Sequence, residues 1–394
     1  MKQVYWIWLS QCFHTGSNLP AELCKALGGA EEIFRTEPGN FPPIQGLRKD
    51  HLEALGNKDL SAAQRVWEQC RALKIGVLTW EDPRYPQRLR HIYGPPMVLY
   101  YLGDLSLLHQ PVSIGIVGSR SSSLYGMNVA SVLSYQLALQ GIVVVSGCAV
   151  GGDSRAHDGA LRAGGMTIGV EACGLDVNYP ADNTKLRRAI ARKGLLLSEL
   201  EPGQRPSRKY FSVRNRLISG LSDGVVVVEA PQRSGCLLTA RLAVEQSRDL
   251  FCVPPRDIFS RQCSGVVEFL RDGAKPVFGV EDILNEYRER LEGADLRIPT
   301  SPAGKTPVQA ASSVSENPNS SQSFQEDLPP VSKEAVTSLS GIPQKVYQAL
   351  HGTMQANELA ELTQQDAGKV IAALTELELD GLVRQLGGGR YEKR

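Results

Sequence analysis

Apolar residues follow two alternating patterns between residues 76 and 290. Short apolar runs bounded by glycine, proline or serine have the length of buried strands, and amphipathic stretches of helical spacing lie between them. We expect strands at 97–102, 113–117, 142–147, 167–171, 195–198, 224–229 and 250–253. We expect helices at 125–140, 181–193, 213–221, 235–247 and 266–271. This alternation predicts an α/β fold built on a doubly wound parallel sheet.

The first 75 residues carry helical patterns only, at 4–13, 21–27, 29–34, 47–55 and 60–73. They predict a small all-helical domain, which we assign to 1–75, with the sheet domain at 76–290. Residues 44–47 resemble the tight turn of a helix–hairpin–helix unit, so the domain is of that kind or of the SAM kind. Such a turn can touch a DNA backbone, but a single match is more often a plain helix connection.

The C-terminal third divides into a linker and a small domain. Serine, proline, glutamine, asparagine and threonine dominate residues 291–340, which predicts a disordered linker because too little apolar surface is available for burial. Residues 341–394 predict helices at 343–350, 356–362 and 366–379, then a hairpin at 382–392 turned by Gly387–Gly389. This pattern resembles a winged helix. Its six Lys and Arg against seven Asp and Glu favour a protein contact over DNA reading by the third helix.

Composition narrows the class of protein without defining it. A chain of 394 residues exceeds the usual size of one domain, and 42% hydrophobic residues support a sizeable core. The formal charge is +1, so any nucleic-acid binding requires a local basic patch. The eight cysteines form no CxxC pair, which favours reduced core residues in a cytoplasmic protein without a metal site. No apolar run approaches the ~20 residues of a membrane span.

Three apolar runs end in turns of small residues that each precede a helix. The residues concerned are Gly118 and Ser119, then Gly147, then Ser234 and Gly235 with Thr239 in the following helix. Carboxyl ends of parallel strands meet at one edge of a sheet, where helix starts favour anions such as phosphate. Arg120 adds a guanidinium suited to phosphate oxygens. The turns match neither GxGxxG nor GxxxxGK[ST], so a structural role for them stays open.

The densest run of cations spans residues 205–216 and contains no acidic residue. It holds five cations and two aromatic residues, namely Arg205, Arg208, Lys209, Tyr210, Phe211, Arg214 and Arg216. Cations can meet phosphates while rings stack on unpaired bases, which suits single-stranded nucleic acid. The alternative is a solvated loop with the two rings in the core.

Asp153 and His157 are four residues apart and would share a helix face, a spacing that invites an acid–base interpretation. No nucleophile or set of metal ligands accompanies them. A helix-start aspartate that holds the histidine in place is the simpler hypothesis.

The motifs, taken in order, resemble those of the DNA-processing protein A family (DprA, also called Smf) across residues 80–285. The matching segments are 117–120, 125–126, 146–153, 156–161, 174–176, 179–180, 198–199, Phe211 with 214–216, 228–230, 234–235, 238–241 and 272–274. Each segment is weak alone, and the ordered set is specific.

The resemblance implies an extended Rossmann-like domain that binds single-stranded DNA, and a homodimer that hands the strand to the RecA recombinase during natural transformation. It implies a binding and loading protein, with no cofactor and no catalytic residue. Mapped onto this chain, the strand-binding pocket would contain Arg120, Arg208 or Lys209, Phe211, and Arg214, Asn215 and Arg216. The three helix starts, with Gly118, Ser119, Gly147, Ser234, Gly235 and Thr239, would contact phosphates.

Several positions depart from the family pattern. Gly152 replaces an isoleucine, Ser212 replaces a proline and Cys236 replaces a serine. A second class of function also stays open, that of an enzyme acting on nucleotides or sugar phosphates, such as the phosphoribohydrolases. Those enzymes carry a Pro-Gly-Gly-x-Gly-Thr loop with a catalytic glutamate, whereas residues 230–235 here lack two of its three glycines, and Glu229 is more simply structural. A protein-only adaptor is the third, weaker alternative.

Overall fold

The computed structural model describes residues 2–292, 341–366, 369–370, 373–374, 377, 382–386 and 390–393. The chain divides into two compact units, Met1–Thr306 and Pro307–Arg394. Nearly all of the predicted linker, from residue 293 to 340, lies outside the described residues.

A nine-stranded sheet forms the centre of the first unit, in the order β1-β2-β6-β5-β4-β3-β7-β8-β9. The seven strands from β6 to β9 are parallel, and β1 and β2 are antiparallel additions at one edge. The α/β fold predicted from the sequence is therefore confirmed. The strands are β1 (Gly76–Thr79), β2 (Val98–Gly103), β3 (Ser113–Val117), β4 (Val143–Ser146), β5 (Thr167–Val170), β6 (Leu195–Ser198), β7 (Gly224–Val227), β8 (Asp249–Cys252) and β9 (Lys275–Pro276).

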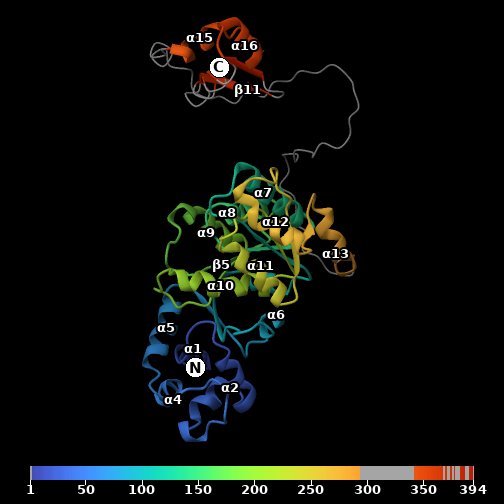
Figure 1. The fold of residues 1–394 in the computed structure, drawn as a ribbon. Coiled ribbons are helices and arrows are strands. Elements are labelled where there is room, and N and C mark those ends of the chain that lie inside the picture. The colour runs from blue at the N-terminus through green and yellow to red at the C-terminus, as the bar shows by residue number, and fades with distance from the viewer. Residues whose placement is uncertain are drawn as a thin grey trace. The chain divides into compact units, whose positions relative to one another are not determined.

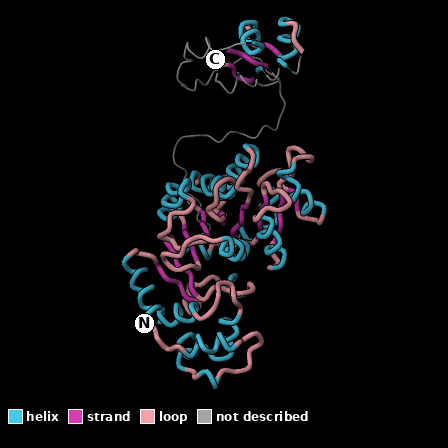
Figure 2. Tube along the Cα trace, turned by 60° about the vertical axis from the view of Figure 1, so that its left-hand side comes forward, coloured by secondary structure: helices cyan, strands magenta, loops and turns pink. Residues whose placement is uncertain are grey.

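Helices lie on both sides of the strands (Figures 1 and 2). α7 packs on α8 and α8 on α9, whereas α10 packs on α11. Their inner faces join the fully buried central strands in one core, as expected for a sheet covered on both sides. The helices are α6 (Gln87–Arg90), α7 (Leu124–Leu139), α8 (Gly152–Arg162), α9 (Thr184–Lys193), α10 (Arg208–Leu221), α11 (Cys236–Glu245), α12 (Ser264–Arg271) and α13 (Glu281–Glu292).

α10 begins at Arg208, five residues before the predicted start at 213. Ser207 caps it, since its hydroxyl accepts a hydrogen bond from the Tyr210 amide. A serine at this position is an ordinary signal for the start of a helix, and the prediction from the sequence did not use it. As a result, the basic and aromatic run from 208 to 216 lies on one helix, and successive residues of the run point in different directions.

The N-terminal helices pack directly against the sheet. They are α1 (Lys2–Gln11), α2 (Leu19–Leu27), α3 (Ala30–Arg35), α4 (Lys49–Gly56) and α5 (Ser61–Ala72), close to the five predicted. Trp6 and Ile7 share a buried cluster with Met97, Tyr100 and Leu196 of the sheet region. The shared core explains why both parts form one compact unit.

The loop at residues 44–47 is a tight turn. Gly46 has a φ of +86°, which favours glycine, and the Leu47 amide donates to the Ile44 carbonyl. A single 3₁₀ turn, Pro38–Asn40, precedes it, and α4 follows. The segment before the turn is therefore shorter than the first helix of a helix–hairpin–helix unit.

The second unit contains α15 (Gly341–Ala349), α16 (Ala356–Thr363) and a small antiparallel sheet in the order β10-β12-β11. The strands are β10 (Met354–Gln355), β11 (Val383–Leu386) and β12 (Arg390–Lys393). Within the predicted third helix, the described residues from 369 to 377 are helical, and the predicted glycine turn at 387–389 lies outside the described residues. Val346, Leu359, Leu374 and Tyr391 belong to its separate buried core.

All eight cysteines are free thiols, and five of them are buried. In the described part of the chain, no helix is long and apolar enough to cross a bilayer. The same residues contain no group of three His, Cys, Asp or Glu side chains arranged to hold a metal ion.

Candidate nucleic-acid interface

A cavity of about 350 Å³ lies beside the ends of β3 and β7. These strands are neighbours, but the chain proceeds from β3 toward β4 and from β7 toward β8, in opposite directions across the sheet. This is the topological switch point, where open α/β sheets bind their ligands. The lining residues are Val117, Gly118, Ser119, Arg120, Ala149, Asp153, Phe211, Arg214, Asn215, Ile218, Pro231, Ser234, Gly235, Cys236 and Thr239.

Most of the site residues proposed from the sequence meet at this cavity. Nine of them line it, namely Gly118, Ser119, Arg120, Phe211, Arg214, Asn215, Ser234, Gly235 and Thr239. Gly147 lines a smaller adjoining cavity that also contacts Arg120 and Phe211. Arg208, Lys209 and Arg216 line neither cavity. The turns after β3 and β7 and part of α10 are therefore brought together, while a role for them in binding stays a prediction.

Arg120 and Phe211 form the exposed rim of both cavities. The guanidinium carbon of Arg120 lies 4.8 Å from the centre of the Phe211 ring, a cation–π contact. Arg120 is exposed. It makes no hydrogen bond or ion pair with any residue in the described part of the chain, so its donors are available to a ligand. The half-buried Phe211 ring also meets Tyr179, with ring centres 5.7 Å apart.

Arg214 lies in the floor of the cavity and is buried. Its Nη1 donates to the carbonyl oxygen of Gly147 at 2.6 Å and to that of Val170, which joins the ends of β4 and β5. Burial lowers the pKa of Arg214 and raises the pKa of the neighbouring Asp153, while the attraction between them opposes both changes. A guanidinium keeps its proton even so, and Arg214 therefore acts chiefly as a buried brace that adds positive potential.

Arg216 is placed differently from the expectation. Its Nη2 lies 2.7 Å from a carboxylate oxygen of Glu199, and its side chain is 7% exposed. Arg216 follows Arg214 by two positions on α10, so the two arginine side chains leave the helix on different faces. The expectation that Arg216 lines the strand-binding pocket is corrected: it holds α10 against the segment after β6.

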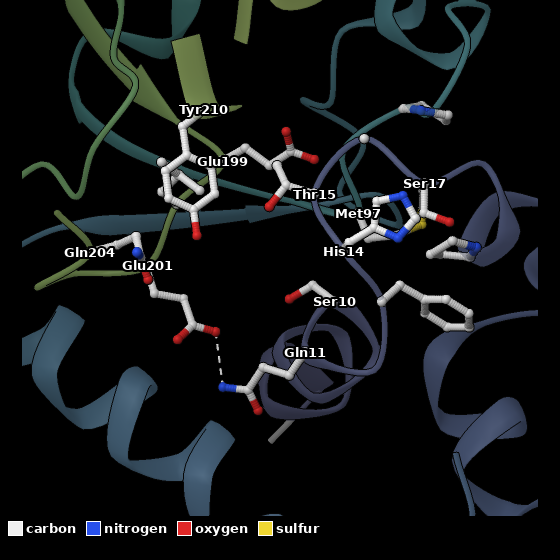
Figure 3. Close-up of a pocket in the computed structure, with 15 residues that line it drawn as sticks. Ser10, Gln11, His14, Thr15, Ser17, Met97, Glu199, Glu201, Gln204 and Tyr210 are labelled. Atoms are coloured by element: carbon white, nitrogen blue, oxygen red, sulfur yellow. Dashed lines mark hydrogen bonds between the residues drawn. The ribbon is translucent and has the colours of Figure 1, made fainter. Parts of the chain in front are cut away.

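The first turn of α10 separates its side chains in the same way. Arg208 and Lys209 are exposed on this turn, outside the cavity. Tyr210 points into a separate polar cleft of about 180 Å³, beside Glu199 and Glu201 (Figure 3). Phe211 alone of the two rings faces the cationic cavity. A shared stacking role for both aromatic residues is therefore excluded by their positions.

The start of α7 is closed to an anion by groups of the protein itself. The Ser119 amide donates to the Glu229 carbonyl at 2.8 Å, and the Ser123 amide donates to the Glu229 carboxylate at 2.6 Å. The Ser123 hydroxyl in turn accepts from the Gly126 amide. The expectation that this helix start offers its amides to phosphate is therefore corrected.

The start of α11 is arranged differently. No side chain caps it, and Ser234, Gly235 and Cys236 at this start line the cavity. Asn215 of α10 donates to the Gly235 carbonyl at 3.2 Å and holds the turn in place. An uncapped helix start carries a partial positive charge, so α11 is the helix start that best suits an anion here.

Close backbone packing shapes the cavity wall. A Cβ added at Gly152 would lie 2.8 Å from the Cα of Gly118, so the turn after β3 and the start of α8 touch through two glycines. Gly151 has a φ of +86°, and a Cβ there would lie 2.4 Å from the Ser119 carbonyl oxygen. The glycine at 152 thus permits direct contact between the turn after β3 and the start of α8.

The two candidate acid–base groups are engaged elsewhere. His157 Nδ1 lies 2.7 Å from the Thr167 hydroxyl and not against Asp153. Asp153 accepts a hydrogen bond from the Gly118 amide at 3.4 Å. Burial lowers the pKa of His157 to about 3, so the ring is neutral near pH 7. The sequence hypothesis that Asp153 holds His157 in place is therefore wrong, because Thr167 bonds to the ring and Asp153 bonds to the turn after β3.

Together these groups define a cavity with a cationic floor and an aromatic edge, at the switch point of an extended parallel sheet. The model of the DNA recombination-mediator protein A family matches residues 76–288. The model of the DprA winged helix domain matches residues 330–389. The protein therefore belongs to the DNA recombination-mediator protein A family, whose members carry the names DprA and Smf, and the winged-helix interpretation of the second unit is confirmed.

Individual relatives agree with this assignment. The protein is 32% identical to Protein Smf of Synechocystis over all of this chain and 99% of the relative, and 38% identical to the DNA processing protein DprA of Bacillus subtilis over 63% of this chain and 85% of the relative. The solved structure of DprA from Streptococcus pneumoniae aligns with a TM-score of 0.62 at 33% identity, over 71% of this chain and 95% of that one. DprA from Helicobacter pylori, solved in a study of its single-stranded DNA binding mode, aligns with a TM-score of 0.51 at 34% identity, over 55% and 96%.

Proposed function

We propose that the protein binds single-stranded DNA in the cavity at the switch point. The observation that carries the proposal is the rim formed by Arg120 and Phe211, an unpaired cation on an aromatic ring above an uncapped helix start. When Arg120 turns to a phosphate, it leaves one face of the ring for a base. Stacking of this kind accepts any base and requires that the base be unpaired.

The proposed contacts follow from position in the cavity. Arg120 and the α11 start, with Ser234, Gly235 and Thr239, bind phosphate, and Phe211 stacks. Gly118, Ser119, Gly147 and Asn215 shape the walls, while Arg214 braces the floor. Arg208 and Lys209 meet the strand outside the cavity, from the exposed first turn of α10. The Helicobacter pylori relative, whose solved structure concerns its single-stranded DNA binding mode, supports this ligand.

The role in recombination follows from family membership. We propose that a homodimer of this protein holds a single strand and passes it to the RecA recombinase. Measuring RecA assembly on a single strand covered by single-strand-binding protein tests this step, and light scattering tests the dimer. A rate of assembly unchanged by this protein excludes the loading role, even if binding itself holds.

The alternative function, an enzyme acting on nucleotides or sugar phosphates, would require an accessible catalytic glutamate. The Glu229 carboxylate binds the Ser123 amide and hydroxyl and is 3% exposed, so it has no open path to a substrate. We therefore propose binding without a chemical step. Incubation with nucleoside monophosphates is expected to release no free base, and turnover would establish the enzyme instead.

Replacement of Arg120 by alanine tests the central proposal. Affinity for labelled oligo-dT should fall, and the slope of log K against log salt should decrease by about 0.7, because one phosphate contact is lost. Fluorescence anisotropy in a salt series measures both quantities. Arg271→Ala, an exposed arginine on α12, is the matched control. Equal affinities of Arg120→Ala and the control would refute the assignment, and equal binding of duplex and single strand would refute the ligand.

A further inference from the structure

We propose that the exposed cationic face of α9 carries the single strand after it leaves the cavity. This inference rests on the proposed function and extends the binding site beyond the cavity. The face consists of Lys185, Arg188, Arg192 and Lys193, all exposed. The first three are spaced i, i+3 and i+7, which places them in one stripe along a helix about 15 Å long.

The four cations are available to a ligand. No carboxylate of the described residues lies within ion-pair distance of any of them, and Arg192 donates only to the Arg188 carbonyl at 3.3 Å. Arg187 behaves in the opposite way. It lies on the buried side of α9, 2.6 Å from Glu171. The helix therefore separates one internally neutralised arginine from a stripe of free positive charge.

Three contacts fix α9 to the cavity wall. Tyr179, just before the helix, meets the Phe211 ring at 5.7 Å. Asn183 at its start donates to the Cys148 carbonyl at 2.9 Å. Arg187 holds Glu171, which lines the adjoining cavity together with Arg120 and Phe211. The stripe therefore begins beside the rim, and α9 then runs back along the sheet, away from its carboxyl edge.

The neighbouring helix extends the same surface. α8 packs against α9, and the two run beside each other in Figure 1. Arg155 of α8 is exposed and, within the described chain, has no ion-pair partner. Arg162 of α8 is paired with Asp158 at 3.3 Å, and Asp182 lies exposed just before α9. Positive charge exceeds negative charge along this path, as expected for a surface that follows a polyanion.

The chemistry of the stripe selects phosphate over bases. It contains no aromatic side chain, so attraction to the backbone is the available interaction and is independent of sequence. An acidic protein is the other polyanion that could fit. Its carboxylates are spaced irregularly, whereas a strand that leaves the rim beside Tyr179 meets the start of α9 and its evenly spaced cations. We therefore assign the stripe to single-stranded DNA.

The test compares two oligo-dT probes, of about 6 and about 25 nucleotides, with the full-length protein. The triple variant Lys185→Ala, Arg188→Ala, Arg192→Ala should bind the short probe as the wild type does. For the long probe, affinity should fall by about 100-fold at 0.1 M salt, and the salt slope should decrease by about 2, because three phosphate contacts are lost. Arg241→Ala, Arg271→Ala, Arg288→Ala removes equal charge from exposed positions on α11, α12 and α13 and is the matched control.

The outcomes separate the two proposals. Unchanged affinity of the α9 variant for the long probe overturns the inference, and so does an equal loss for both probes. A loss of affinity for polyglutamate of matched charge, with no change for the long probe, identifies an acidic protein as the occupant and also overturns it. If the wild type fails to bind the short probe and Arg120→Ala binds the long probe normally, the proposed function itself is wrong.

Discussion

Arg214 illustrates how a single residue can support a binding site without reaching the ligand. It is a buried cation beside a buried carboxylate, and both contribute to one cavity wall. Removal of one member of a buried charge pair leaves the other without compensation, which is usually more damaging than removal of both. The arginine therefore has a structural role that an affinity measurement alone would misread.

Arg214→Met should destabilise the protein by about 3–5 kcal/mol, because the buried Asp153 carboxylate loses its neighbouring cation. Arg214→Met combined with Asp153→Asn should cost less than Arg214→Met alone. Urea unfolding of wild type, both single variants and the double variant measures the coupling between the two residues. Additive effects would show that the two charges do not stabilise each other.

His157 predicts a pH dependence of stability. Its folded pKa of about 3 lies below the ordinary value of 6.5, so below pH 6.5 the unfolded state takes up a proton that the folded state does not. The free energy of unfolding should therefore decrease as pH falls from 7 to 5, and this residue accounts for about 2 kcal/mol of the decrease.

The matched variant is His157→Asn, whose amide can replace the donor facing Thr167. The Thr167 hydroxyl gives its one proton to the Val144 carbonyl, so the ring Nδ1 is the donor to Thr167. Chemical denaturation at pH 7, 6 and 5 should show a shallower loss of stability for the variant. Parallel curves for both proteins would mean that another group causes the acid sensitivity.

At the scale of the helix, α10 decides which residues can act together. Its first turn sends Tyr210 into the polar cleft and Phe211 to the cavity, and its second and third turns bury Arg214 and Arg216 in different surroundings. A run of adjacent cations and rings in the sequence thus becomes several separate groups in space. The binding surface is assembled from single positions on α10 together with the turns after β3 and β7.

Phe211→Ala should weaken oligo-dT binding by roughly 1–3 kcal/mol, whereas Tyr210→Ala should leave it nearly unchanged. The two variants remove neighbouring rings from one helix, so a general effect on α10 would appear in both. Anisotropy titration measures affinity, and circular dichroism melting checks that each variant is folded. Equal losses of affinity would contradict the placement of Tyr210 in the polar cleft and of Phe211 at the cavity.

The sequence predicted the elements better than the side-chain partners. The strands 113–117 and 195–198 match β3 and β6 to the residue, because continuous apolar runs between breakers leave few alternatives. The predicted start of α10 is five residues too late. Because the run 208–212 was not recognised as helical, the sequence did not show that its side chains point in different directions. The pairing of Arg216 with Glu199 joins distant segments, so no local pattern could reveal it.

The closure of the α7 start could not be predicted for the same reason. Glu229 follows β7, more than a hundred residues after Ser123, yet parallel pairing of β3 with β7 places them together. The three small-residue turns looked equivalent in the sequence. Their differences come from neighbours that only the assembled sheet supplies.

At the scale of the whole chain, the two compact units have separate hydrophobic cores. Residues 1–292 contain 34 Lys and Arg against 30 Asp and Glu, while residues 341–394 have one more acidic than basic residue. Every residue of the proposed cavity and of the α9 stripe belongs to the first unit. Binding of a single strand should therefore be a property of that unit, and the winged-helix unit is free to serve a protein partner.

A chain that ends at Glu292 should bind oligo-dT within roughly 0.5 kcal/mol, about twofold, of the full-length protein. Its core and charge surplus are intact, and the segment removed carries net negative charge. Anisotropy at matched salt compares the two proteins, with light scattering to verify that their assembly states agree. A large loss of affinity at equal assembly state would give the winged-helix unit a direct role on DNA. Its removal leaves the core of the first unit intact and takes away no positive surplus, so the cavity itself would be unchanged.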